Sequence, residues 1–168
     1  MADNTLSLDD VRRLYERHGP ALVVYACRYT TDVARAEDVV HGIFHRLLRG
    51  GVTVPDHPAG YLYRAVRNAA LNALRNEARA APLGESCFVH RGGNREAALA
   101  LQEALSELPE EQSEVVIMRI WGGMTLNEAA AASGVTLNTA ASRYRYALAK
   151  LRETFQPQGP KEPEEKKS

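Results

Sequence analysis

One run of aromatic, amide and cationic side chains has the spacing needed to bind a single strand of nucleic acid. When the segment is drawn as a helix, these side chains share one narrow stripe, and Leu62, Val66, Ala69 and Ala73 occupy the opposite, buried side. Aromatic rings stack on bases, and guanidinium groups pair with phosphates. An ordinary solvent-exposed face is the alternative interpretation. The stripe consists of Tyr61, Arg64, Asn68, Asn72, Arg75 and Arg79.

A second run of polar side chains, nearer the C-terminus, suits the major groove of duplex DNA. Amides, hydroxyls and guanidinium groups read base edges and phosphates there. A merely solvated face would normally mix glutamates with its arginines, and no acid stands between Leu137 and Arg152. The candidate DNA-reading residues are Asn138, Thr139, Ser142, Arg143, Arg145 and Tyr146. The opposite, core face is predicted to hold Leu137, Ala140, Ala141, Tyr144, Ala147, Leu148 and Leu151.

The residues just before this second run predict a helix-turn-helix. Thr125 and Glu128 have the spacing of a capping box, which fixes where a short helix begins. Gly134 can take a positive φ at the turn, and Thr136 can cap the next helix. A capped helix, a glycine turn and a long second helix thus arrive in the order that a DNA-binding helix-turn-helix requires.

Helix is predicted throughout, because Ala, Leu, Arg and Glu dominate and apolar residues recur at intervals of three and four. Ser7 and Asp10 are expected to open the first helix, and Gly19-Pro20 to end it before a second helix that reaches Tyr29. The remaining helices are expected at about 36–49, 59–80, 95–106, 109–121, 125–133 and 137–155.

The fold class that follows is all-α, with two small helical domains joined by a flexible linker. Prolines and glycines without helical periodicity mark the linker at 81–94. The domains are then 7–80 and 95–155, the second of which contains the helix-turn-helix. Residues 156–168 carry proline and charge without apolar residues and are expected to be disordered.

Charge and hydropathy restrict the compartment and the partners. Lys and Arg number 21 and Asp and Glu number 21, so only local basic strips can bind a polyanion. No apolar stretch approaches the roughly 20 residues of a membrane span, and the start lacks the order of a signal peptide. A cytoplasmic location without membrane insertion is therefore expected.

No arrangement of residues in the sequence indicates a catalytic site or a cofactor-binding site. Nothing resembles a nucleophile with its base or a phosphate-binding loop, so neither a catalytic residue nor a cofactor is expected. His41 and His45, four apart on one helix, could form half of a zinc site, but no third ligand is spaced nearby. The chain is predicted to be a binding protein and not an enzyme.

Four motifs resemble those of the extracytoplasmic-function (ECF) group of bacterial sigma factors, in the sigma-70 family. Residues 36–44 are similar to that family's second-region helix, and 61–68 with Arg75 resemble its promoter-melting segment. Residues 105–121 resemble the opening of its fourth region, and 139–143 resemble its recognition helix. The four motifs stand in the family's order, and the resemblance runs from about Leu8 to Phe155.

The resemblance implies a sigma factor that binds RNA polymerase core and directs promoter recognition, melting and initiation. It implies that the second-region helix docks on a coiled coil of the largest subunit, and that 105–121 bind the flap of the second-largest subunit. It assigns the stripe at 61–79 to the melted upstream-ten strand and the recognition helix to the upstream-thirty-five duplex. An anti-sigma protein is a further candidate partner. The residues assigned to polymerase, or to supporting that contact, are Glu37, Asp38, His41 and Phe44.

Two other functions compete with this interpretation. A regulator that binds duplex DNA as a dimer could use the same helix-turn-helix without polymerase. A purely structural helical adaptor would leave promoter binding unchanged when Arg64 or Arg143 is replaced. Binding to core polymerase would distinguish a sigma factor from the dimeric regulator. A loss of promoter binding on replacing Arg64 or Arg143 would distinguish it from the structural adaptor.

Overall fold

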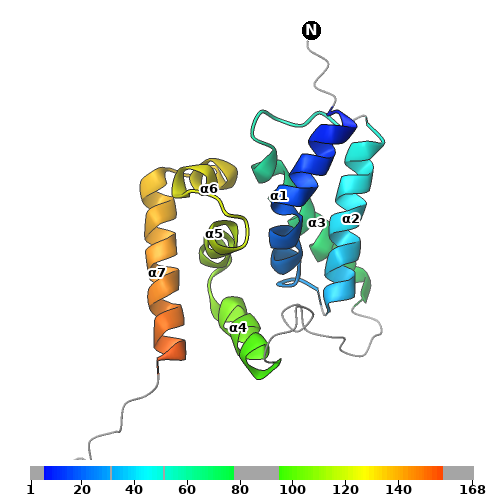
Figure 1. Cartoon of the computed structure of the whole chain (residues 1–168). Coiled ribbons are helices and arrows are strands. Elements are labelled where there is room, and N and C mark those ends of the chain that lie inside the picture. The colour runs from blue at the N-terminus through cyan, green and yellow to red at the C-terminus, as the bar shows by residue number, and fades with distance from the viewer. Residues whose placement is uncertain (1–5, 31, 51, 78–94, 157–168) are drawn as a thin grey trace, which may run out of the picture.

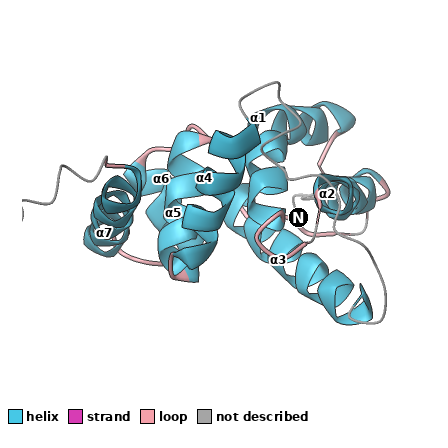
Figure 2. Cartoon of the chain, turned by 90° about the horizontal axis from the view of Figure 1, so that it is seen from below, coloured by secondary structure: helices cyan, strands magenta, loops and turns pink. Residues whose placement is uncertain are grey.

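The structure is a computed structural model that describes residues 6–30, 32–50, 52–77 and 95–156, and all its regular elements there are α-helices (Figures 1 and 2). This confirms the all-α prediction. None of these helices is both long and apolar enough to span a bilayer. The predicted linker and tail lie outside the described residues, except for Gln156. The helices are α1 (Leu8–Ala26), α2 (Val33–Leu48), α3 (Pro58–Glu77), α4 (Arg95–Glu107), α5 (Glu110–Ile120), α6 (Leu126–Ser133) and α7 (Leu137–Phe155).

The first helix corrects one expectation from the sequence. Ser7 and Asp10 do form the capping box that begins α1, but Gly19-Pro20 does not end the helix, which continues to Ala26 with Pro20 inside it. A proline inside a helix costs about 3 kcal/mol, because it removes one backbone hydrogen bond and crowds the preceding turn. Beyond Pro20 the same face buries Leu22 and Tyr25 almost completely. Burying two such side chains offsets a cost of that size.

The first three helices pack side by side through their apolar faces (Figure 1). Asp32 caps α2 by accepting a hydrogen bond from the backbone N–H of Arg35, and this anchors the turn after α1. The buried residues recur at helical intervals, as the sequence predicted. The core side chains that α2 and α3 contribute include Val40, Ile43, Phe44, Leu47, Leu62, Tyr63 and Val66.

The predicted helix-turn-helix is confirmed at α6 and α7. The Thr125 side chain and the Glu128 side chain form the capping box at the start of α6. Gly134 ends α6 in the left-handed conformation, with φ of 67°. The Thr136 hydroxyl then accepts a hydrogen bond from the backbone N–H of Thr139, which begins α7.

The second group of helices has a small core of its own. Leu105 and Leu108, at the end of α4 and the turn after it, pack with Val116 of α5 and Ala147 of α7. Pro109 stands as the N-cap of α5 and not as its first helical residue, a shift of one position from the sequence prediction. Small residues at Ala140 and Ala147 allow α7 to approach its neighbours closely, and both are fully buried.

A larger core continues from the first group of helices into the second. Buried side chains of α5, the α5–α6 turn and α6, among them Ile117, Met124 and Ala132, belong to the same apolar cluster as the α1–α3 residues. At this junction a Cβ added to Gly60 of α3 would lie 2.6 Å from the carbonyl oxygen of Ala132. The absence of a side chain at Gly60 therefore permits α3 and α6 to meet backbone to backbone.

Replacing Gly134 with alanine should lower the free energy of unfolding by about 1 kcal/mol, because an L residue is strained at this positive φ. The matched control is Gly42→Ala, in the middle of α2, where an added Cβ meets no atom within 4 Å. It should raise the free energy of unfolding by about 0.5–1 kcal/mol, since alanine favours a helix interior. Urea denaturation measures both, and equal changes in the two variants would contradict the assigned turn.

Candidate nucleic-acid interface

The predicted single-strand stripe lies on one face of α3. Arg64, Asn68, Asn72 and Arg75 are exposed, and Tyr61 is half-buried at the start of the stripe. Leu62 and Val66, on the opposite side, are fully buried, as expected for an amphipathic helix. Arg79 lies outside the described residues. The geometry supplies a row of amides and guanidinium groups in solvent, and its use as a binding face stays a prediction.

The predicted duplex-reading residues divide into two sets along α7. Asn138, Thr139, Arg145 and Tyr146 are exposed, whereas Ser142 and Arg143 are half-buried. The Arg145 guanidinium lies over the Tyr146 ring, 5.5 Å from its centroid. Leu137, assigned to the core face by periodicity, is 45% exposed.

The residues assigned to polymerase lie on α2. Asp38 and His41 are exposed and Glu37 is half-buried, whereas Phe44 is in the core and packs edge-on against the Tyr15 ring at 5.1 Å. The Nε2 atom of His41 lies 3.1 Å from the Tyr15 hydroxyl. Phe44 is thus placed to hold this surface in shape. Among the described residues, no three His, Cys, Asp or Glu side chains gather closely enough to bind a metal ion.

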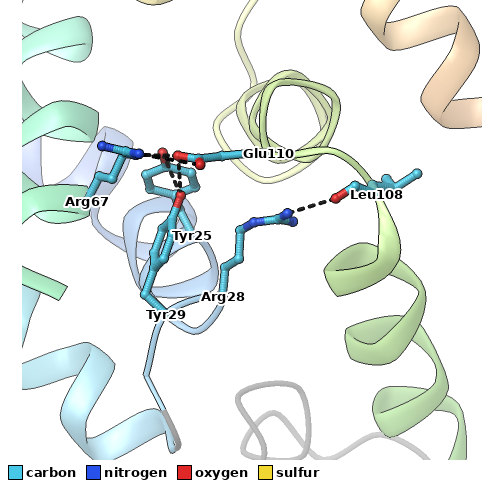
Figure 3. Close-up of polar contacts among 6 residues, drawn as sticks. All are labelled: Tyr25, Arg28, Tyr29, Arg67, Leu108 and Glu110. Carbon is cyan, nitrogen blue, oxygen red and sulfur yellow. Dashed lines mark hydrogen bonds and ion pairs between the residues drawn. The ribbon is translucent and has the colours of Figure 1, made fainter. Parts of the chain in front are cut away.

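One carboxylate joins the two groups of helices, and sequence reasoning did not find this contact. Figure 3 shows Glu110, at the start of α5, facing Arg67 of α3 and Tyr29, which follows α1. Arg67 donates to both oxygens of Glu110, from Nε to Oε1 and from Nη2 to Oε2. The Tyr29 hydroxyl donates to Oε1 at 2.6 Å. The Arg67 guanidinium holds the pKa of Glu110 below its ordinary value, so this carboxylate is charged at neutral pH.

Two further arginines cross the same junction. Arg28, beyond the end of α1, donates to the backbone carbonyls of Leu105 at 2.9 Å and Leu108 at 2.7 Å. The second of these bonds is drawn in Figure 3. Carbonyls at a helix C-terminus lack partners within the helix, so Arg28 supplies an external cap for α4. Arg17 of α1 pairs with Glu128 of α6 at 3.1 Å, on the exposed rim of the junction.

Glu114, one turn after Glu110, lies where a charged carboxylate is unfavourable. Burial, together with the nearby charge of Glu110, raises its pKa to about 7. Arg143 of α7 and Arg67 of α3 act in the opposite sense. Burial together with Glu114 raises the pKa of Tyr63, and burial alone is the main cause of the raised pKa of Tyr25. Arg143 therefore faces the α5 carboxylates as well as solvent.

Comparisons with known proteins agree with one another. The family model for sigma-70 region 2 matches residues 14–80, and the model for sigma-70, region 4 matches residues 98–151. The ECF RNA polymerase sigma factor SigL of Mycobacterium tuberculosis, strain H37Rv, is 28% identical over 163 residues, which cover 89% of this chain and 90% of that protein. SigL of the CDC 1551 strain matches to the same extent.

A solved structure has the same fold. It is the co-crystal structure of the sigma factor RpoE with the anti-sigma factor NepR from Bartonella quintana. The TM-score is 0.60 at 19% identity, and the match covers 90% of this chain and 100% of that one. This likeness concerns the arrangement of the helices.

The raised pKa of Glu114 predicts a pH-dependent stability. The folded state prefers the protonated carboxyl, so the free energy of unfolding should fall as pH rises from about 4.5 through about 7. Glu114→Gln removes the buried charge and should stabilise the protein by about 2 kcal/mol at pH 8, with little effect at pH 5. Urea denaturation at the two pH values measures this.

The control is Glu107→Gln, at an exposed position in the last turn of α4. It should change the free energy of unfolding by less than about 0.5 kcal/mol at both pH values. A Glu114→Gln effect of equal size at pH 5 and pH 8 would show that the carboxyl does not titrate between them.

Proposed function

This chain belongs to the sigma-70 family, as a sigma factor of the ECF group that directs RNA polymerase core to promoters, and on that premise we propose which of its surfaces make each contact. The exposed face of α3 binds the melted upstream-ten strand. The exposed face of α7 reads the upstream-thirty-five duplex. The observation that carries the proposal is that each of the two matched regions presents one exposed helix face with cationic and amide groups and no acid among the proposed contacts.

The α3 face suits an unpaired strand for physical reasons. Arg64 and Arg75 lie on the same side as Asn68 and Asn72, so phosphates and base edges can be contacted along one line. Tyr61 supplies an aromatic surface on which a base can stack. A paired duplex cannot offer its base faces to such a helix, so binding here favours the melted state.

The α7 face suits duplex DNA because it follows a rigid, doubly capped turn. Residues near the N-terminus of a recognition helix are the ones that contact base edges. Asn138 and Thr139 occupy this place and are exposed, and Arg145 lies two turns further on, where a phosphate contact is expected. Ser142 and Arg143 lie between them at the margin of the core.

The polymerase contacts are proposed for α2 and for the segment 105–121. On α2, Asp38 and His41 offer exposed polar groups for the coiled coil of the largest subunit, with Glu37 beside them and Phe44 as support. In α5 the apolar side chains Val115 to Met118 are buried, and Ile120 is 54% exposed. Contact with the flap of the second-largest subunit is therefore proposed through the exposed side of α5.

The proposed role is binding without catalysis. Polymerase carries out RNA synthesis, and this chain supplies two weak DNA contacts that become strong when polymerase holds them at a fixed spacing. Such a protein works where polymerase works, which places it in the cytoplasm. The related RpoE fold was solved with an anti-sigma factor, and we include a protein of that class among the proposed partners.

Transcription from a promoter library with purified core polymerase tests the function and both elements together. Arg64→Ala and Arg145→Ala should each lower promoter occupancy by the holoenzyme about tenfold, since each removes a charged DNA contact. Arg13→Ala, on the exposed side of α1, removes the same charge outside both faces and should change occupancy less than about twofold. Equal losses in all three variants would mean that only net charge matters.

A further inference from the structure

The acidic start of α5 lies against the cationic side of α3. Glu110, Glu111 and Glu114 line one hollow together with Arg64 and Arg67. Arg64 belongs to the proposed single-strand face, and Arg67 is half-buried at its edge. In this arrangement, the α5 carboxylates lie beside the α3 arginines, in the space that the phosphates of a bound DNA strand would also need.

The Glu110 contact has the chemistry of an arginine–phosphate contact. Both of its oxygens accept from the Arg67 guanidinium, a two-point geometry that carboxylates share with phosphates. The Tyr29 hydroxyl donates to the same carboxylate, as a tyrosine can donate to a phosphate oxygen. The two donors come from different elements and converge on one anionic group (Figure 3).

The backbone contact between α3 and α6 closes the part of α3 that carries Gly60, whereas Arg64, Asn68 and Asn72 further along stay exposed. Gly60, directly before Tyr61, lies against the Ala132 backbone with no room for even a methyl group. A nucleic acid strand cannot pass between helices at that separation. Tyr61, at the start of the α3 face, is only partly accessible as long as α5 and α6 remain packed on α1 and α3.

We propose that Glu110 is an internal substitute for a promoter phosphate: it occupies Arg67 in the packed form, and Arg67 becomes a DNA contact once α5 leaves α3. This deepens the proposed function and rests on it. The apparent affinity of the free protein for a single strand is then reduced by the fraction of molecules that are open. Arg67 joins the single-strand face as a further phosphate-binding residue.

Two variants open the packed form by independent means. Glu110→Gln keeps the shape of the side chain and removes the charge that holds Arg67. Gly60→Ala leaves all charges in place and inserts a methyl group into the α3–α6 contact, and alanine suits the α3 helix better than glycine. Glu107→Gln, exposed at the end of α4, matches the charge change of Glu110→Gln and leaves the contact between Arg67 and Glu110 in place.

The assay measures fluorescence anisotropy of a labelled single-stranded DNA oligonucleotide with the full-length chain, and small-angle X-ray scattering gives its radius of gyration. Glu110→Gln should tighten binding about fivefold and Gly60→Ala about tenfold, both with a larger radius of gyration. Glu107→Gln should tighten it less than about twofold. If neither junction variant binds more tightly than Glu107→Gln, the proposal is overturned.

The role of Arg67 is tested in the opened protein. In the Gly60→Ala background, Arg67→Ala should reduce the slope of log affinity against log salt by about 0.7, the value for one phosphate contact on a single strand. An unchanged slope would remove Arg67 from the DNA contacts. Transcription by wild-type protein with core polymerase is scored separately, so loss of the proposed function is distinguishable from loss of this inference.

Discussion

At the centre of this protein, one carboxylate is accommodated between two sets of helices. Glu110 begins α5, where the helix dipole favours a negative charge, and it meets a guanidinium and a tyrosine hydroxyl from the other set. The same placement carries Glu114 one turn deeper, where burial raises its pKa to about 7. A helix that presents acids to a partly apolar junction needs opposing cations, and Arg67 and Arg143 supply them from α3 and α7.

The apolar contacts and the charges have different tasks at this junction. The Arg67 and Glu110 side chains are 42% and 34% exposed, and an ion pair of that kind contributes about 1 kcal/mol or less. Burial of Ile117, Met118 and Met124 in the core shared with α1–α3 contributes more, at about 1.5–3 kcal/mol for each such side chain. Apolar burial therefore holds the two sets together, and the ion pair makes a smaller contribution.

Both α3 and α5 therefore have one side in the apolar core and another side that makes polar contacts. One side of α3 belongs to the core, the other carries the proposed single-strand contacts, and Arg67 lies at the boundary between them. The apolar side of α5 is buried and its acidic first turn contacts α3. Because the proposed single-strand face and the acidic first turn of α5 meet in one contact, a change that weakens this packing also releases Arg67 from Glu110.

The sequence by itself determined the helices, their caps and the two polar faces, because each of these depends on residues within about four positions of one another. Ser7 with Asp10, Thr125 with Glu128, and Gly134 are local features, and the structure confirms all of them. Only the tertiary structure decided that α1 continues through Pro20, that Leu137 stays exposed and that Arg67 meets Glu110. These outcomes depend on burial between distant segments, and residues 43 positions apart leave no periodic signal in one sequence.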